Sequence, residues 1–435
     1  MRTVVVGSGP IGTFAGLMLA RRGHEVVLVD RDTGPAADGT WRRRGVMQFE
    51  LPHFFRWIVR QAICEEVPEL WSALLLAGGL PATPSGMPAQ LTGLQCRRST
   101  FERAVWTFAT AEPRLRRVTG HVDDLVLRGG RVTGAAVDGA EVDADLVIVA
   151  TGRAAKIGDA LRAAAEGGSC GFSYAARQYR ALPGVALPEW GMPSRAVHDG
   201  YETIVFPQDA GTITALFVRP TDDPMLAGVR RNDVFQRVAA AIPNLAPWTD
   251  PERFVPISSV CSGSNLVNRY RGQRAATGAV TPGVVFLGDA VCTTNPAAGR
   301  GVALGMLQAR QLVRLIEQHR ELAQVAAEFD DWCRAEIRPW FDDHVHWDAT
   351  ELARFRGEDL DLEDRIPSDV VCACAQVDPS IMAAAGPFLG MLAGPRALDQ
   401  VQDKARAVLL SGWRPPYAEG PGRNEVAALE LALAS

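Results

Sequence analysis

The stretch Val4-Val5-Val6-Gly7-Ser8-Gly9-Pro10-Ile11-Gly12, near the start of the chain, decides the fold. Its apolar run is typical of a buried strand, and its glycines turn that strand directly into a helix. Gly7 permits the tight turn, Gly9 leaves room for a pyrophosphate at the helix N-terminus, and Gly12 allows close packing of helix and strand. The sequence therefore predicts a strand–helix unit that binds a dinucleotide, with further contacts from Pro10 and Ile11.

A second apolar segment, residues 25–29, completes this unit. It ends at Asp30, where an acid is expected to bind ribose hydroxyls, and Arg31 follows at the same edge. A glycine turn without a ligand would need no such acid. The combination of strand, helix, second strand and acid therefore favours nucleotide binding over a purely structural turn.

The composition is that of a large folded enzyme. The chain has 435 residues, of which 47% are hydrophobic, enough for two joined domains. The net charge of −5 and the scattered arginines provide no basic surface, so nucleic acid is not expected as a partner. No apolar run reaches the roughly 18 residues of a membrane-spanning helix, and the first strand leaves no room for a signal peptide. We expect a cytoplasmic protein without an integral membrane segment.

The eight cysteines are dispersed and include no Cys-x-x-Cys pair, so reduced thiols are expected. Cys372-Ala373-Cys374 could bind a metal or form a strained disulfide, but no neighbouring His or Cys completes such a site. No metal site is predicted.

The hydrophobic patterns predict an α/β fold in three parts. Residues 1–152 and 281–320 are expected to form a discontinuous Rossmann-like nucleotide-binding domain, because both contain apolar strands that end in glycine turns. Residues 153–280 are rich in strand-like segments and predict an inserted, mostly antiparallel substrate-binding sheet. Residues 321–435 are expected to be a helical C-terminal region.

Several elements can be placed within these parts. A helix with a serine or threonine cap is expected from Arg98, and strands are expected over residues 201–207 and 212–219. Four aromatic residues recur near one helix face in the C-terminal region and are expected to be core rather than cofactor contacts. They are Phe329, Trp332, Trp340 and Trp347.

A second glycine motif, Val285-Phe286-Leu287-Gly288-Asp289-Ala290, lies far along the chain and is followed by Asn295-Pro296-Ala297-Ala298-Gly299-Arg300-Gly301. The order of the motifs resembles the group A flavoprotein monooxygenases over residues 1–320. In that family FAD lies in a Rossmann-like domain beneath a substrate-binding sheet. The alternative is a Gly-Asp turn that only ends a strand.

The resemblance implies a role for each matching residue. Asp289 would accept hydrogen bonds from the ribityl hydroxyls, and Arg98 would lie near the FAD phosphates or ribityl chain. The helix after Gly301 would direct its positive end to the flavin N1 and C2 carbonyl. The implied FAD contacts outside the first motif are Asp30, Arg31, Arg44, Gln48, Arg98, Val122, Thr151, Gly152, Gly288, Asp289, Pro296, Ala298, Gly299, Arg300 and Gly301.

The chain also resembles a narrower group, the bacterial epoxidases and hydroxylases that tailor polyketides and isoprenoids and are related to squalene epoxidase. Arg44-Gly45-Val46-Met47-Gln48 with Pro52-His53 is similar to their Gly-Val-Pro-Gln segment and histidine beside the flavin. The chain departs from them at Met47, which replaces a proline, and at residues 297–302, which replace a Tyr-Gly-Gln-Gly-Met sequence. Thr151-Gly152 replaces the Asp-Gly of many group A enzymes.

This resemblance implies an FAD-dependent monooxygenase. One oxygen of O2 would pass through a flavin C4a-hydroperoxide into a small hydrophobic substrate, by epoxidation or hydroxylation, in natural-product tailoring. The flavin carries the chemistry, so no catalytic side chain is assigned. The candidates near the ring are Arg44, Gln48 and Pro296, although the run Arg42-Arg43-Arg44 can equally be a solvated charge run. His53 is expected to be structural.

Only one Gly-x-Gly-x-x-Gly motif occurs, so the chain has no second motif of this kind to bind NADPH or NADH. NADPH or NADH would bind transiently, or a partner flavin reductase would supply the electrons.

The same motifs are compatible with other functions. A flavin-dependent halogenase is disfavoured, since the chain has no Trp-x-Trp-x-Ile-Pro segment and neither Lys156 nor Lys404 stands at the halogenase lysine position. An FAD-dependent reductase or dehydrogenase resembling geranylgeranyl reductase stays open, because it would use the same cofactor site without O2. A non-catalytic flavin-binding redox module is also open, although a complete substrate-sized domain argues against it.

Overall fold

A computed structural model describes residues 1–43, 45–46, 48–49, 51–83, 91–153, 156–187 and 193–431. Its central feature is a five-stranded parallel sheet in the order β19-β10-β1-β2-β6. The strands are β1 (Arg2–Val6), β2 (Glu25–Asp30), β6 (Leu115–Thr119), β10 (Leu146–Val149) and β19 (Val284–Phe286). Valine is frequent because strands of such a sheet are covered on both faces. Val4 pairs with Val27 on one side and with Val147 on the other.

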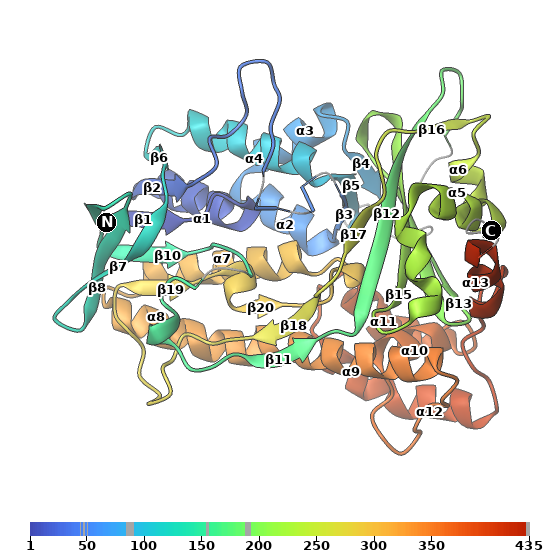
Figure 1. Cartoon of the computed structure of the whole chain (residues 1–435). Helices are drawn as coiled ribbons and strands as arrows, with labels where there is room; N and C mark the ends of the chain where they lie inside the picture. The colour runs from blue at the N-terminus through green and yellow to red at the C-terminus, as the bar shows by residue number, and fades with distance from the viewer. Residues whose placement is uncertain are drawn as a thin grey trace.

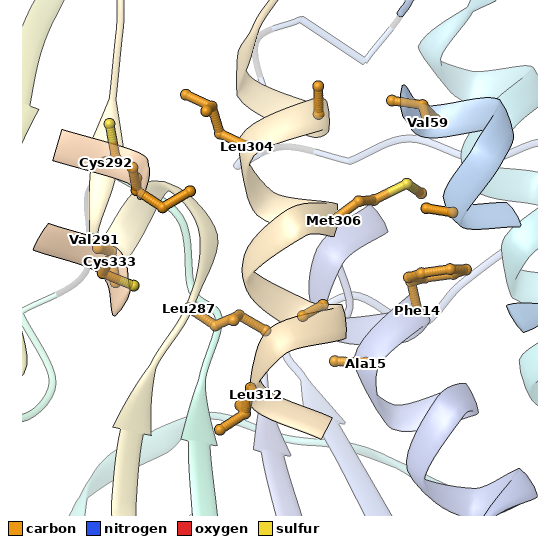
Figure 2. Packing of buried hydrophobic residues seen from close by; sticks show 14 of the residues in the cluster. Phe14, Ala15, Val59, Leu287, Val291, Cys292, Leu304, Met306, Leu312 and Cys333 are labelled. Carbon is orange, nitrogen blue, oxygen red and sulfur yellow. The ribbon is translucent and has the colours of Figure 1, made fainter. Parts of the chain in front are cut away.

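Helices α1 (Pro10–Arg21) and α7 (Gly301–Gln318) pack against each other beside this sheet (Figure 1). Figure 2 shows Met306 of α7 on the side of Phe14 and Val59, whereas Leu287 and Cys292 lie beside the opposite side of the helix. This layer is extended by helices α2 (Trp57–Glu66), α3 (Pro68–Leu76) and α4 (Arg98–Ala111). These apolar contacts hold α7 in place, and they thereby set the position and direction of its N-terminus.

Three smaller sheets accompany the parallel sheet in the described part of the chain. Each has three strands, in the orders β7-β8-β9, β3-β5-β4 and β11-β18-β20. Their bounds are β3 (Pro52–Phe55), β4 (Leu80–Ala82), β5 (Gly93–Arg97), β7 (Val122–Arg128), β8 (Arg131–Val137), β9 (Ala140–Asp143), β11 (Glu166–Ser169), β18 (Val267–Tyr270) and β20 (Cys292–Thr293).

The inserted sheet is antiparallel, in the order β13-β14-β15-β12-β16, with β17 also paired to β12. The strands are β12 (Phe172–Ala181), β13 (Ser194–His198), β14 (Tyr201–Pro207), β15 (Thr212–Pro220), β16 (Phe254–Pro256) and β17 (Cys261–Gly263). Helices α5 (Asn232–Ala241), α6 (Ala246–Thr249) and α13 (Arg423–Leu431) lie beside this sheet (Figure 1). Phe217 of β15 belongs to the same buried cluster as Phe235 of α5 and Val426 of α13.

The C-terminal region is helical, as predicted. Helix α8 (Leu322–Trp332) continues through one π-helical turn (Cys333–Ile337) into α9 (Arg338–Phe355). Figure 1 shows α9 running along one side of the molecule from β18 towards α10. The remaining helices are α10 (Ser368–Cys374), α11 (Met382–Leu389) and α12 (Gln402–Leu410). Among the described residues no helix has the length and apolar character needed to cross a membrane. All eight cysteines are free.

The predicted α/β architecture is confirmed, because β19 (Val284–Phe286) joins strands from the first 149 residues in one parallel sheet. Strand β14 has the expected bounds, and β15 ends one residue later than expected. The expected serine or threonine cap of α4 is wrong. The N-cap position is Arg97, and no side chain of its own caps the helix.

Asp209 instead holds the start of α4 from the turn between β14 and β15. Its Oδ1 accepts a hydrogen bond from the backbone N–H of Arg97 at 2.7 Å. Its Oδ2 accepts from Nε of Arg97 at 3.0 Å and from Oγ1 of Thr100 at 2.8 Å. Asp209 is only 2% exposed. The antiparallel sheet is therefore fixed to the nucleotide-binding part through one buried carboxylate.

We predict that Asp209→Ala lowers the free energy of unfolding by about 3 kcal/mol, because it removes one partner of a buried ion pair. Urea denaturation followed by circular dichroism measures this change. Asp403→Ala is the control, since Asp403 is fully exposed and forms an ion pair at 3.3 Å with Arg406 on the surface of the same helix. Equal midpoints for the two variants would contradict the role assigned to Asp209.

Candidate functional site

A single cavity of about 1830 Å³ opens at the carboxyl ends of the parallel strands. Its lining comes from the ends of β1, β2, β10 and β19, from β14 and β15 of the antiparallel sheet, and from α9. Ligands of parallel α/β sheets bind at this edge. The cavity therefore joins the region expected to hold a nucleotide to the region expected to hold a substrate.

The first glycine motif has the backbone geometry of a dinucleotide-binding turn. Gly7 has φ +104°, and a Cβ there would lie 2.6 Å from the carbonyl oxygen of Ala150. A Cβ on Gly12 would lie 2.1 Å from the carbonyl oxygen of Gly7, so only glycine permits this packing. Gly9 differs, because no heavy atom lies within 4 Å of its Cβ position. Its missing side chain leaves the space in which a pyrophosphate is expected.

Two helices begin at this cavity without a side-chain cap. The N-cap of α1 is Gly9, followed by Pro10, and the N-cap of α7 is Arg300. Free N–H groups and the helix dipole favour an anion at each terminus. The two termini suit the two anionic parts of reduced FAD, its pyrophosphate and its N1–C2 region. The residues present therefore fit this cofactor.

Asp30 is oriented at the end of β2 by several donors. Its Oδ2 accepts from the backbone N–H of Ser8 at 2.6 Å and from Nη2 of Arg43 at 3.0 Å. Its Oδ1 accepts from the backbone N–H of Asp32 at 2.9 Å. Burial disfavours the ionised carboxyl, but Arg43 and these N–H groups outweigh burial and lower the pKa of Asp30. Asp30 therefore lines the cavity as a carboxylate.

Arg43 is a residue whose role the sequence did not reveal. It is 8% exposed and forms ion pairs with Asp30, with Asp32 at 3.3 Å and with Glu102 at 2.5 Å. The interpretation of the arginine run as solvated is therefore wrong for Arg43. The acids that surround it come from distant segments, and only the Asp30-x-Asp32 spacing hinted at a cationic partner.

Asp289 faces the same cavity from the turn after β19. Burial raises the pKa of its carboxyl, while Arg98, Arg153 and Arg269 act in the opposite direction. A Cβ placed on Gly301 would lie 3.6 Å from Oδ1 of Asp289, so the carboxylate stands beside the N-terminus of α7. This position suits the predicted contact with ribityl hydroxyls.

Most of the predicted FAD contacts come together. Those that line the cavity are Gly7, Gly9, Pro10, Ile11, Asp30, Arg31, Gln48, Arg98, Val122, Thr151, Gly152, Gly288, Asp289, Pro296, Ala298, Gly299 and Gly301. Gly12 is not among them, because it packs against Gly7. Arg44 lies outside the described residues.

Arg300 is the main correction among the predicted contacts. Its side chain is 4% exposed, and its Nη1 donates to Oδ2 of Asp343 at 2.8 Å. The guanidinium also lies 4.8 Å from the ring of Trp340. The side chain therefore packs into the C-terminal region, and the predicted contact with FAD is left to its backbone.

The loop of residues 295–301 is held by the C-terminal region. The backbone N–H of Asn295 donates to Oδ1 of Asn268 at 2.7 Å. Both amide side chains donate to Asp348 of α9, Asn268 at 2.6 Å and Asn295 at 3.0 Å. Nε2 of His344 donates to the carbonyl oxygen of Asn295 at 3.1 Å. Burial and Arg300 lower the pKa of this imidazole to about 3 and keep it neutral, although the bond to Asn295 acts in the opposite direction. These bonds fix the loop expected to lie against the flavin.

The apolar wall of the cavity comes from the antiparallel sheet. Ile204 and Phe206 of β14 line it together with Leu216 and Val218 of β15. Ile204 pairs with Leu216, so both side chains share one face. The pairing register decides which residues face the cavity, and a single sequence does not give that register.

The polar wall comes from α9 and was missed by the sequence interpretation. His344, Trp347, Asp348 and Glu351 all line the cavity and recur at helical spacing. Phe329 and Trp340 are buried in the core, as predicted for the aromatic stripe. Trp347 is the exception, because the same helix turns one face to the core and another to the cavity.

Comparisons with known proteins agree with this geometry. Residues 2–88 match the family described as FAD dependent oxidoreductase. The flavin-dependent brominase Bmp2 has 15% sequence identity and a TM-score of 0.67, over 95% of this chain and 99% of Bmp2. PqsL, a probable FAD-dependent monooxygenase from Pseudomonas aeruginosa, has 16% identity and a TM-score of 0.61, over 82% of this chain and 99% of PqsL. The myxobacterial chondrochloren halogenase CndH has 15% identity and a TM-score of 0.61, over 94% of this chain and 97% of CndH.

At these identities the solved structures establish the fold. With the family match they support an FAD-dependent oxidoreductase whose fold is shared by flavin monooxygenases and flavin halogenases. The narrower resemblance to relatives of squalene epoxidase stays a prediction.

We predict that Gly9→Leu abolishes stoichiometric FAD binding without loss of fold, because the new side chain would occupy the pyrophosphate space. FAD absorbance after gel filtration measures the loss. Gly394→Leu is a matched control, since Gly394 is also an N-cap with extended backbone followed by proline and has nothing within 4 Å of its Cβ position. Full FAD content in folded Gly9→Leu would contradict the assignment of this turn.

Burial raises the pKa of Asp348 to about 7, although Asn268 and Asn295 oppose the shift. Because the native pKa exceeds the ordinary 3.8, the native state binds more protons than the unfolded state between about pH 4 and 7. This contribution stabilises the fold at acid pH and is lost as the pH rises through 7. It amounts to at most about 4 kcal/mol.

Asp348→Asn should therefore flatten the fall in unfolding free energy between pH 5 and pH 8, measured by denaturant titration at each pH. The exposed control Asp403→Asn should keep the wild-type slope. The same slope in Asp348→Asn as in the wild type would show that Asp348 is ionised throughout this range.

Proposed function

We propose that the protein is an FAD-dependent monooxygenase that inserts one oxygen atom of O2 into a small substrate. One observation carries the proposal. A single cavity extends from the dinucleotide turn at Gly9, past the loop of residues 295–301, to the apolar face of the antiparallel sheet at Ile204 and Leu216. A cofactor bound at the first end can thus reach a substrate bound at the other.

When bound, reduced FAD would supply the oxygen transfer in its reaction with O2, so the side chains bind and position rather than react. The N-terminus of α1 and Asp30 would hold the nucleotide half. Asp289 would hold the ribityl chain, and the backbone of residues 295–301 would support the ring.

The apolar wall of β14 and β15 would exclude water from the reacting atoms. Ile204 and Leu216, which pair across the two strands, would present this dry surface to the substrate. Epoxidation or hydroxylation in natural-product tailoring follows from the narrower resemblance and is part of this proposal. So is the electron source, NADPH, NADH or a partner flavin reductase.

A halogenase is the second candidate, because Bmp2 and CndH share the fold over 95% and 94% of this chain. Against it stands the sequence, which lacks a Trp-x-Trp-x-Ile-Pro segment. Lys156 lines the cavity, but it lies after β10 rather than at the family's lysine position. Monooxygenation therefore remains the better-supported reaction.

The test uses FAD-loaded protein that is photoreduced with EDTA as the sacrificial electron donor, which removes the need for NADPH, NADH or a flavin reductase. It is mixed with isotopically labelled O2 and a panel of small alkenes, indoles and phenols, with and without bromide. We expect a product that has gained one labelled oxygen atom, detected by mass spectrometry, and none with Gly9→Leu.

Three other results would overturn the proposal. Stoichiometric hydrogen peroxide without any oxygenated product would indicate a flavin-binding module. Reduction of a carbon–carbon double bond without O2 would indicate a reductase. A brominated product that requires bromide would indicate a halogenase.

A further inference from the structure

A group of charged residues lines the cavity where β13, β14 and α9 meet. Nη2 of Arg195 donates to Oε2 of Glu202 at 2.6 Å and to Oε1 of Glu351 at 2.8 Å. All three residues line the cavity, and none belongs to the glycine motifs or to the predicted FAD contacts. We call this group the Arg195 cluster.

The Arg195 cluster has more negative than positive charge once both of its acids are ionised. One guanidinium stands between two carboxylates, which leaves a net charge of −1 when both acids are ionised. Arg354 also acts on Glu351, but it already pairs with Asp369 at 3.1 Å. In that state the cluster is therefore short of one positive charge.

One carboxylate oxygen of Glu202 marks the position at which a positive charge is missing. The residue is 2% exposed, and its Oε1 accepts no hydrogen bond from any residue that the structure describes. A buried carboxylate oxygen without a donor is costly. An arginine that bonds both acids through the same nitrogen does not reach this oxygen.

The surroundings of the cluster suit a molecule with an apolar body. Ile204 follows Glu202 on the same face of β14 and also lines the cavity. Trp347 lines the cavity as well, and its ring lies 5.5 Å from the guanidinium of Arg195. A ligand at this point would thus meet apolar side chains along its body and a carboxylate at its end.

We propose that the Arg195 cluster binds the protonated amine of the substrate, so that the substrate class is a small, mainly apolar molecule with a basic amine. The ammonium would donate to Oε1 of Glu202 and complete the charge of the cluster. This inference rests on the proposed function only in taking the bound amine to be the molecule that is oxygenated.

The pKa of Glu351 provides a second, independent expectation. Burial raises this pKa to about 8; Glu202 and Asp369 raise it further, whereas Arg195 and Arg354 lower it. The carboxyl therefore loses its proton over the range in which an alkylamine is still protonated. Amine affinity should rise from pH 6.5 to pH 8.5.

The experiment measures binding to oxidised, FAD-loaded protein by equilibrium dialysis with three matched probes: tryptamine, 3-ethylindole and indole-3-propionate. We expect tryptamine to bind at least about tenfold more tightly than the other two. Glu202→Gln should remove most of this preference while the FAD content stays full. Glu252→Gln, an exposed site, should keep it.

Equal affinity for the three probes, tighter binding of the anion, or no binding of any probe would overturn the inference. So would an unchanged preference in Glu202→Gln. If that variant does not fold, the wild-type pH dependence decides, and an affinity for tryptamine that is flat or falls from pH 6.5 to pH 8.5 contradicts the site. Because no turnover is involved, amine selectivity without oxygenated product would leave this site standing and reject the monooxygenase proposal instead.

Discussion

The rest of the site depends on the buried carboxylate of Asp348. It accepts hydrogen bonds from Asn268 of β18 and from Asn295, while Asp348 itself stands on α9. These residues come from β18, the second glycine motif and the C-terminal region. A carboxylate at this depth is tolerated only with its donors in place, so the three segments have one compatible arrangement. The C-terminal helices are therefore part of the cavity and not an appendage to it.

A second tie reaches the same loop from the N-terminal side. Nη2 of Arg56 donates to the carbonyl oxygen of Ala298, and its Nη1 donates to that of Leu389 at 2.9 Å. Burial, with Arg300 nearby, lowers the pKa of Arg56 to about 10, so the guanidinium stays charged at neutral pH. The loop thus lies between a cation and the N-terminus of α7. Both favour negative charge on whatever the loop supports.

The parts of the site that the sequence revealed are those determined within one short segment. The turn at Gly7 needs a positive φ, and Gly12 meets the backbone of Gly7. Asp30 ends the buried strand β2, and Asp289 lies in the turn that follows the buried strand β19. Arg43 and Glu202 could not be assigned in this way. Arg43 owes its burial to acids on β2, the following turn and α4, and Glu202 faces the cavity because of strand parity in β14. Both depend on which distant segments meet.

The charged residues make the two ends of the cavity electrostatically different. Its loop end has the charged Arg56 and the uncapped terminus of α7, whereas its other end has the Arg195 cluster with one carboxylate oxygen unpartnered among the described residues. The charge of Arg300 changes this difference between the two ends of the cavity little, because Arg300 forms an ion pair with Asp343. A cationic group is disfavoured at the loop and favoured at Glu202, so an amine would be bound with its apolar part towards the loop. The same charges that would stabilise a reduced flavin would then also orient the molecule presented to it.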